Sequence, residues 1–267
     1  MNEYIIFTDL DGTLLDHHDY SFTEAMPALK KIRALQIPLI INSSKTFAEI
    51  KEIREKMHIN WAFSVENGAA IFLPEGKLSG TDKQMEQIIL GIPYHKILNI
   101  LRSLREIDGF SFKGFSDFSV KELMLETGLP EVEATQAKQR LASEPLLWLG
   151  GEEQLKLFEE KLNHQGLQLI QGGRFLHVMG KNDKSTAMAW LLNRFKLDSK
   201  IVTIALGDSQ NDLRMLEQAD YAAIIRKKNG EYLQISKSPE TIVTSKSIAP
   251  MGWQEAIDDL FKNLNIG

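Results

Sequence analysis

Short runs of apolar residues separated by helical patterns constrain the fold of this chain more than any other feature. The early and late runs are apolar throughout, as strands covered on both faces should be. Amphipathic segments lie between them. Two of these begin, at Ser21 and Thr46, with a hydroxyl residue followed three positions later by glutamate, the pattern of a capping box. This alternation predicts an α/β fold with a doubly wound parallel sheet. The expected strands are Tyr4–Thr8, Pro38–Asn42, Ala62–Val65, Val202–Leu206, Tyr221–Ile225 and Thr241–Thr244.

The middle of the chain has a different pattern. From about Thr81 to Phe175, helical stretches alternate with short and weak strand candidates. We therefore expect residues 1–81 and 180–267 to form a Rossmann-like core, and residues 82–179 to form an inserted α+β cap. The expected cap elements are helices at Tyr94–Arg105, Lys121–Thr127, Glu131–Arg140 and Glu152–Gln165, and strands at Gly109–Phe112, Leu146–Leu149 and Leu167–Gln171.

Two pairs of carboxylates follow expected strands. Asp9 and Asp11 open the string D-L-D-G-T-L after the first strand, and Asp208 and Asp212 belong to the string G-D-S-Q-N-D after a later one. Neighbouring buried carboxylates are costly unless a cation or a proton compensates them. Ligands of open α/β sheets bind beyond the carboxyl ends of the strands. The two pairs therefore indicate a compensating cation or proton at that edge, although Asp9 and Asp11 could merely shape a turn or cap a helix, and Asp212 also suits the first turn of a helix.

Anion-binding residues follow at two further places. Ser43, Ser44 and Lys45 come after the second expected strand, where hydroxyl groups and free N–H groups at a helix start can bind an anion. Lys184 follows Asp183, a plausible N-cap, so its charge opposes the helix dipole at a cost of roughly 0.3–1 kcal/mol. A bound anion would offset that cost, although a solvated lysine and simple helix capping also fit each motif taken alone.

These four motifs, in this order, resemble the haloacid-dehalogenase-type phosphatase superfamily over essentially the whole chain. The long insert after the second motif resembles the α+β cap of its sugar-phosphatase branch. Within that branch the chain is similar to the mannosyl-3-phosphoglycerate phosphatase family, which shares Ser43-Ser44-Lys45-Thr46, Glu66-Asn67-Gly68-Ala69, Gly172-Gly173-Arg174-Phe175-Leu176-His177-Val178 and Gly207-Asp208-Ser209-Gln210-Asn211-Asp212.

The resemblance implies a magnesium-dependent phosphatase. Asp9 would be the nucleophile that forms an aspartyl-phosphate, and Asp11 the general acid and base. Ser43 and Lys184 would bind the phosphoryl oxygens. The implied magnesium ligands are Asp9, the backbone carbonyl of Asp11, Asp208 and Asp212, the last acting either directly or through Lys184 and water.

Substrate recognition is expected to come from loops around the site and from the cap, with a glycerate carboxylate or a sugar hydroxyl as the recognised group. Regular alternation along a strand would put Arg174 and His177 on opposite faces, so a single one of the two would make that contact. Each candidate also has a purely structural interpretation, such as a turn at Asn-Gly. The substrate-binding candidates are Ser44, Lys45, Asn67, Arg174 and His177.

Composition limits the partners. The formal net charge is −5, which gives no sign of a nucleic-acid or membrane surface. The chain has no cysteine, and its N-terminus lacks a basic leader and a long apolar run, so we expect a cytoplasmic enzyme with a small phosphorylated sugar as partner. Alternatives are glucosyl-3-phosphoglycerate or a hexose phosphate as substrate, a phosphotransferase or phosphomutase, and a non-catalytic module. A dehalogenase is disfavoured because a halide needs no acid at Asp11.

Overall fold

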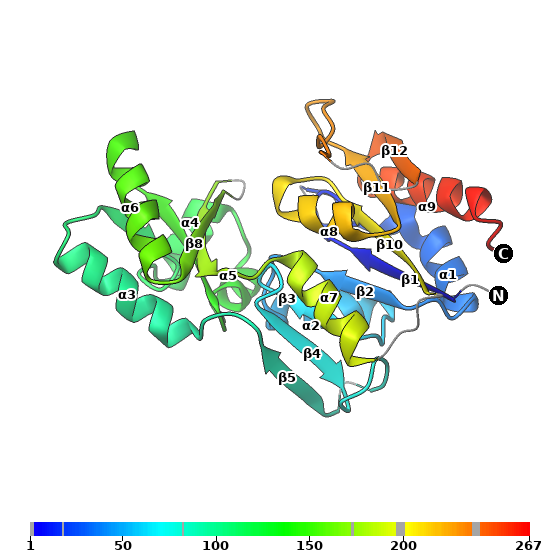
Figure 1. Ribbon diagram of the computed structural model, residues 1–267, viewed down its shortest axis with the longest axis horizontal. Coiled ribbons are helices and arrows are strands. Elements are labelled where there is room, and N and C mark those ends of the chain that lie inside the picture. The colour runs from blue at the N-terminus through cyan, green and yellow to red at the C-terminus, as the bar shows by residue number, and fades with distance from the viewer. Residues whose placement is uncertain (1–2, 18, 82, 172–173, 196–200, 237–240) are drawn as a thin grey trace.

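The computed structural model describes residues 3–17, 19–81, 83–171, 174–195, 201–236 and 241–267. Within these residues the strands form two separate sheets, one of eight strands and one of four (Figure 1). None of the helices in this part of the chain has the length and apolar character needed to span a membrane.

The larger sheet has the order β12-β11-β10-β1-β2-β3-β4-β5. It is parallel from β12 to β3, and β4 and β5 join it antiparallel. All six strands expected from the sequence are present, and the expected α/β class is confirmed. The strands are β1 (Glu3–Thr8), β2 (Leu39–Asn42), β3 (Phe63–Val65), β4 (Ala70–Pro74), β5 (Met85–Ile89), β10 (Ile201–Gly207), β11 (Tyr221–Arg226) and β12 (Thr241–Ile248).

Helices cover both faces of this sheet, which explains its continuous apolar strands. Ile6 of β1 packs in a cluster with α1, α2 and α9, whereas Ile5 and Phe7 point the other way into a cluster with α7 and α8. Neither face of β1 can therefore carry polar side chains. The helices are α1 (Met26–Ala34), α2 (Phe47–Met57), α7 (Lys184–Arg194), α8 (Leu213–Gln218) and α9 (Met251–Asn263), with 3-10 turns η1 (Thr23–Ala25) and η2 (Gln210–Asp212).

The two expected capping boxes have different outcomes. At α2 the Thr46 hydroxyl accepts the Glu49 N–H, and the Glu49 carboxylate accepts the Thr46 N–H. This box is confirmed. At Ser21 the prediction is wrong, because a 3-10 turn with Phe22 at its N-cap comes first and α1 begins only at Met26. The Ser21 hydroxyl instead accepts the Thr23 N–H and donates to the Thr23 hydroxyl, a local turn that competes with the helix.

The smaller sheet is antiparallel, with the order β6-β7-β9-β8. One cluster joins it to α3 and α6, and a second packs α4 against α5. We call this part the cap. Its elements are α3 (Tyr94–Glu106), β6 (Phe112–Gly114), α4 (Val120–Thr127), α5 (Glu131–Ala137), β7 (Ser143–Trp148), α6 (Glu152–His164), β8 (Leu167–Gln171) and β9 (Leu176–Gly180).

The chain passes from the large sheet to the cap after β5 and returns after β9. β5 lies beyond residue 81, where we expected the core to end, yet it pairs with β4 along its whole length. Its sequence, Met-Glu-Gln-Ile-Ile, is polar on one side because this strand lies at the edge of the sheet. The sheet of the core therefore extends about eight residues past the expected boundary at residues 81 and 82, and the small sheet ends with β9 at Gly180.

Candidate active site

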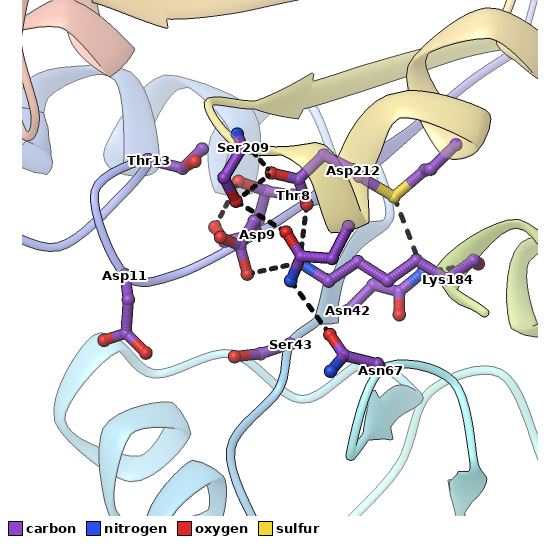
Figure 2. A network of polar contacts seen from close by, with 12 residues as sticks. Thr8, Asp9, Asp11, Thr13, Asn42, Ser43, Asn67, Lys184, Ser209 and Asp212 are labelled. Carbon is purple, nitrogen blue, oxygen red and sulfur yellow. Dashed lines mark hydrogen bonds and ion pairs between the residues drawn. The ribbon is translucent and has the colours of Figure 1, made fainter. Parts of the chain in front are cut away.

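Asp9, Ser43, Lys184 and Asp212 lie near one another at the carboxyl edge of the parallel strands (Figure 2). Asp9 follows β1, Ser43 follows β2 and Asp208 follows β10, while Lys184 is the first residue of α7. Because β2, β1 and β10 are neighbours in the sheet, residues from three distant parts of the sequence come together. This edge is where open α/β sheets bind their ligands.

Lys184 lies at the centre of the site. Its side chain is fully buried, and its Nζ is 2.6 Å from Asp9 Oδ1 and 2.5 Å from Asp212 Oδ1. Its backbone carbonyl accepts a hydrogen bond of 2.8 Å from the Asn42 amide, which fixes α7 against the end of β2. Burial lowers the pKa of Lys184, but the two carboxylates outweigh it, so the pKa is raised and the side chain is charged.

Asp9 shares this single positive charge with other acids. The pKa of Asp9 is raised to about 8, chiefly by burial; Lys184 acts in the opposite direction, and nearby Asp212, Asp208 and Asp11 add to the increase. Lys184 cannot fully compensate Asp9 because it is bound to Asp212 as well. A proton, or another cation, is therefore needed for Asp9 in this environment.

Asp212 has its two oxygens committed within the protein. Oδ1 accepts from Lys184, and Oδ2 accepts the backbone N–H groups of Asp208 and Ser209, each at 3.0 Å. A side chain at Gly207 would collide with this carboxylate, since an added Cβ would lie 2.5 Å from the Asp212 Cβ. Asp212 therefore holds both Lys184 and the loop that carries Asp208.

The acidic cluster fits a magnesium ion. Among the described residues, carboxylate oxygens of Asp9, Asp208 and Asp212 lie within 4.8 Å of one another, and all three side chains are buried. With Lys184 they carry a formal net charge of −2 when all are ionised, which a divalent cation would neutralise. Carboxylate oxygens are also the ligands that magnesium prefers. Because Asp212 is occupied, Asp9 and Asp208 are the side chains best placed to contact the ion directly.

Two further side chains position Asp208. The Thr13 hydroxyl donates to Asp208 Oδ1 at 3.2 Å, and His17 Nε2 lies 3.9 Å from Oδ2. The Asp208 carboxylate raises the pKa of His17. The His17 ring packs on Gly12, whose φ is 76° and whose added Cβ would lie 2.2 Å from Nε2. Thr13 and Gly12 belong to the string that predicted the site, whereas nothing in the sequence singled out His17.

Asp11 lies outside the acidic cluster and forms a pair of its own. Its Oδ1 is 3.1 Å from Lys45 Nζ, which is also 3.6 Å from Glu49 and stacks over the Tyr20 ring at 4.4 Å. The two carboxylates raise the pKa of Lys45 despite its burial. Lys45, expected to bind substrate, is thus placed to orient the carboxylate of Asp11.

The Ser43 and Asn67 loops are joined by their backbones. Ser43 is fully buried, and its carbonyl accepts the Asn67 N–H at 2.9 Å. The Asn67 amide oxygen accepts from the Asn211 side chain at 2.9 Å, so three loops of the site are connected (Figure 2). The Ser44 carbonyl accepts from Arg140 of the cap at 3.1 Å.

The two cap candidates have different surroundings. His177 lies in β9 with its Nδ1 buried and, in the described part of the chain, without a hydrogen-bond partner. Burial and the nearby Arg140 lower the pKa of His177 to about 3, so the ring is neutral and can bind a hydroxyl or an acid group. Arg174 precedes β9 and pairs with Glu126 at 3.8 Å. Gly172 and Gly173 of the same string lie outside the described residues.

The α/β fold, with a buried cluster of acids and a lysine at the carboxyl edge of its sheet, defines a class of ligand-binding α/β proteins, and sequence comparison identifies the family. Residues 6–247 match the family of haloacid dehalogenase-like hydrolases. The chain therefore belongs to this family, as the motifs suggested.

Two curated relatives are similar over their whole length, and both are glucosyl-3-phosphoglycerate/mannosyl-3-phosphoglycerate phosphatases. The protein of Methanococcoides burtonii is 37% identical and aligns over 99% of this chain and 100% of its own. The protein of Persephonella marina is 36% identical and aligns over 98% of this chain and 99% of its own. The expected enzyme class, a phosphoric monoester hydrolase, is thereby confirmed.

Solved structures agree on the fold. A protein of Thermoplasma acidophilum superposes with a TM-score of 0.70 at 16% identity, covering all of both chains. A phosphatase of this superfamily from Bacteroides thetaiotaomicron superposes with a TM-score of 0.69 at 17% identity, covering 100% of this chain and 96% of the other. At such identities these structures support the arrangement of core and cap, and not a substrate.

Proposed function

We propose that this protein is a magnesium-dependent phosphatase that converts mannosyl-3-phosphoglycerate to mannosylglycerate through an aspartyl-phosphate on Asp9. Glucosyl-3-phosphoglycerate is the nearest alternative substrate, since the printed names of both curated relatives include both compounds. The observation that carries the chemistry is the buried group of Asp9, Lys184, Asp208 and Asp212 at the carboxyl edge of the sheet. A cytoplasmic location belongs to the same proposal.

In the first half-reaction, Asp9 attacks phosphorus and the bond from phosphorus to the ester oxygen on C3 of the glycerate breaks. Asp11 gives its proton to the departing alkoxide. Lys45, 3.1 Å from Asp11, holds the carboxyl group in place. Lys184 and Ser43 bind the phosphoryl oxygens, where charge is greatest in the transition state.

In the second half-reaction, Asp11 takes a proton from a water molecule, which attacks phosphorus and breaks its bond to Asp9. Inorganic phosphate leaves, and both carboxyl groups return to their initial states. Magnesium, held by Asp9 and Asp208 with the carbonyl of Asp11, would keep Asp9 ionised and reduce its repulsion of the phosphate. Asp212 orients Lys184 and the Asp208 loop throughout.

The cap would recognise the rest of the substrate. The core would contribute Ser44, Lys45 and Asn67. The cap would contribute His177, whose Nδ1 has no hydrogen-bond partner among the described residues. Arg174 remains a candidate for the glycerate carboxylate if a substrate displaces its contact with Glu126.

The experiment is phosphate release from mannosyl-3-phosphoglycerate and glucosyl-3-phosphoglycerate, with magnesium or with a chelator. The native protein is compared with Asp9→Asn and with Asp258→Asn, an exposed control on α9. We expect magnesium-dependent release that Asp9→Asn abolishes and Asp258→Asn retains. Release from other sugar phosphates alone would refute the substrate, and release by Asp9→Asn at the native rate would refute the mechanism.

A phosphotransferase is distinguished in the same assay. A hydrolase releases one phosphate for each ester consumed, whether or not a sugar acceptor is added. Substrate consumption that exceeds phosphate release in the presence of an acceptor would indicate transfer instead.

A further inference from the structure

Glu66 is a fully buried acid that contacts both the cap and the loop of Ser43, Ser44 and Lys45. It follows β3, in the loop that also holds Asn67. Its side chain is 0% exposed, yet it lies outside the acidic cluster around Asp9. A buried carboxylate is costly unless hydrogen bonds or charges compensate it, so the groups that bind Glu66 show which parts of the protein it holds together.

The carboxylate binds the start of β7 in the cap. It accepts the backbone N–H groups of Leu141 at 2.7 Å and Ala142 at 3.1 Å, and the hydroxyl of Ser143 at 2.6 Å. Such hydrogen bonds to an ionised acceptor are shorter and stronger than neutral ones. One core side chain therefore fixes three consecutive residues of the cap.

The backbone of Glu66 and Asn67 holds the loop that carries Ser43 and Lys45. The Glu66 N–H donates to the Lys45 carbonyl at 3.0 Å, and the Asn67 N–H donates to the Ser43 carbonyl at 2.9 Å. Glu66 and Asn67 both adopt left-handed backbone conformations, with φ of 52° and 55°. Non-glycine residues rarely keep that conformation unless their surroundings impose it, and such positions cluster at functional sites.

Two neighbouring contacts reinforce this junction. Arg140 donates to the Ser44 carbonyl at 3.1 Å, and the Thr46 hydroxyl donates to the Gln136 carbonyl at 3.0 Å. The cap segment from the end of α5 to the start of β7 is thus bound to the loop that carries Ser43. Figure 1 shows α5 at this junction, beside the core.

We propose that Glu66 is a positioning residue that sets where the cap stands over Asp9 and Asp11, and so controls hydrolysis of substrates large enough to touch the cap. β7 pairs with β9, with Pro145 opposite His177, so anchoring the start of β7 also places the unpartnered His177 nitrogen. The proposal rests on the proposed function, in that it takes the substrate to be a sugar phosphate held between core and cap.

The test compares two substrates in one set of variants. Glu66→Gln keeps the size of the side chain but removes its charge and one acceptor. Glu86→Gln, on the exposed edge strand β5, makes the same chemical change away from the cap. Each protein is assayed with 4-nitrophenyl phosphate, whose leaving group lacks the sugar hydroxyls and the carboxylate that the cap would recognise, and with the sugar phosphate that the native enzyme hydrolyses fastest.

Glu66→Gln should reduce kcat/KM for the sugar phosphate by about 10- to 100-fold, because a misplacement of about 1 Å has an effect of this size in other enzymes. It should change kcat/KM for 4-nitrophenyl phosphate by less than about twofold. Glu86→Gln should change neither. Equal losses for both substrates, or no loss for either, would overturn the proposal in favour of a purely structural acid.

Two further measurements keep the outcome decisive. Hydrogen exchange at the Leu141 and Ala142 amides should be faster in Glu66→Gln, whatever the substrate is, so this readout is independent of the proposed function. Unchanged exchange would overturn the proposal. If Glu66→Gln does not fold, Ser143→Ala removes one of the three bonds and should show the same substrate selectivity with a smaller loss. An equal loss for both substrates there would again refute a positioning role.

Discussion

Replacing Lys184 by methionine tests the electrostatic account of the site most directly. Lys184 is fully buried and lies 2.6 and 2.5 Å from two carboxylates that are themselves buried. Methionine fills a similar volume but leaves both acids without their cation. Breaking a buried ion pair by removing one partner costs about 3–5 kcal/mol. We expect a loss of that size in the free energy of unfolding of the metal-free protein at pH 8.

The loss should depend on pH and on magnesium. Lys184 lowers the pKa of Asp9, so its removal raises that pKa further. A protonated Asp9 carries no buried charge, and the destabilisation should therefore be smaller at pH 5 than at pH 8. Magnesium supplies the missing positive charge and should recover part of the stability, although phosphatase activity stays lost.

Urea denaturation followed by circular dichroism, in chelator or in magnesium at both pH values, measures these effects. Lys181→Met is the control, because Lys181 is exposed three residues earlier in the chain. A loss below about 1 kcal/mol in chelator at pH 8, or a loss that grows toward pH 5, would show that the acids do not depend on Lys184 for compensation.

Three other predictions concern neighbouring features. The native metal-free protein should lose stability as pH rises from about 4 to 8, by at most about 1.4 kcal/mol per pH unit. The reason is that the pKa of Asp9 is raised from 3.8 to about 8, so the folded state keeps this proton at pH values where the unfolded state has lost it. Thermal melts with a chelator would show the slope, and saturating magnesium should flatten it. Gly68→Ala should destabilise the protein by about 2–3 kcal/mol in urea titrations, since its Cβ would lie 2.1 Å from the Asp183 carbonyl, whereas Gly109→Ala, at a similar φ but with open space around it, should cost clearly less. Lys45→Met should reduce kcat for a sugar phosphate by about 10- to 100-fold and lower the melting temperature less than Lys184→Met does, because Asp11, which loses its partner, is 29% exposed. An unchanged kcat would show that Asp11 needs no orienting cation.

The sequence predicts the central strands well because burial on both faces permits apolar residues alone. Strands β1, β2 and β10 are apolar for this reason, and their lengths leave little choice of structure. The strand β5 carries no such signal, because an edge strand with one exposed face can be polar. This is why the expected first segment of the core, residues 1–81, ends before β5.

The site residues divide in the same way. Asp9, Asp208 and Lys184 are predictable because each follows a strand or opens a helix at the same edge of the sheet. Their mutual contacts need the fold. Glu66 illustrates the limit, since its partners lie about 75 residues away and nothing local shows that its carboxylate faces the cap.

The pairing of β1 with β10 bears on how the polypeptide is made. β1 is synthesised long before β10, which begins at residue 201, so the central strand lacks one neighbour until β10 has been made. The cap, by contrast, is continuous in the chain from α3 to β9 and has its own apolar cluster, so all of it is available for folding before β10 has been synthesised. Helix α9 follows β10 in the chain, and its Trp253 indole donates to the Thr8 hydroxyl beside Asp9. A nascent chain that stalls before α9 therefore contains every residue of the cap but lacks the Trp253 contact beside Asp9.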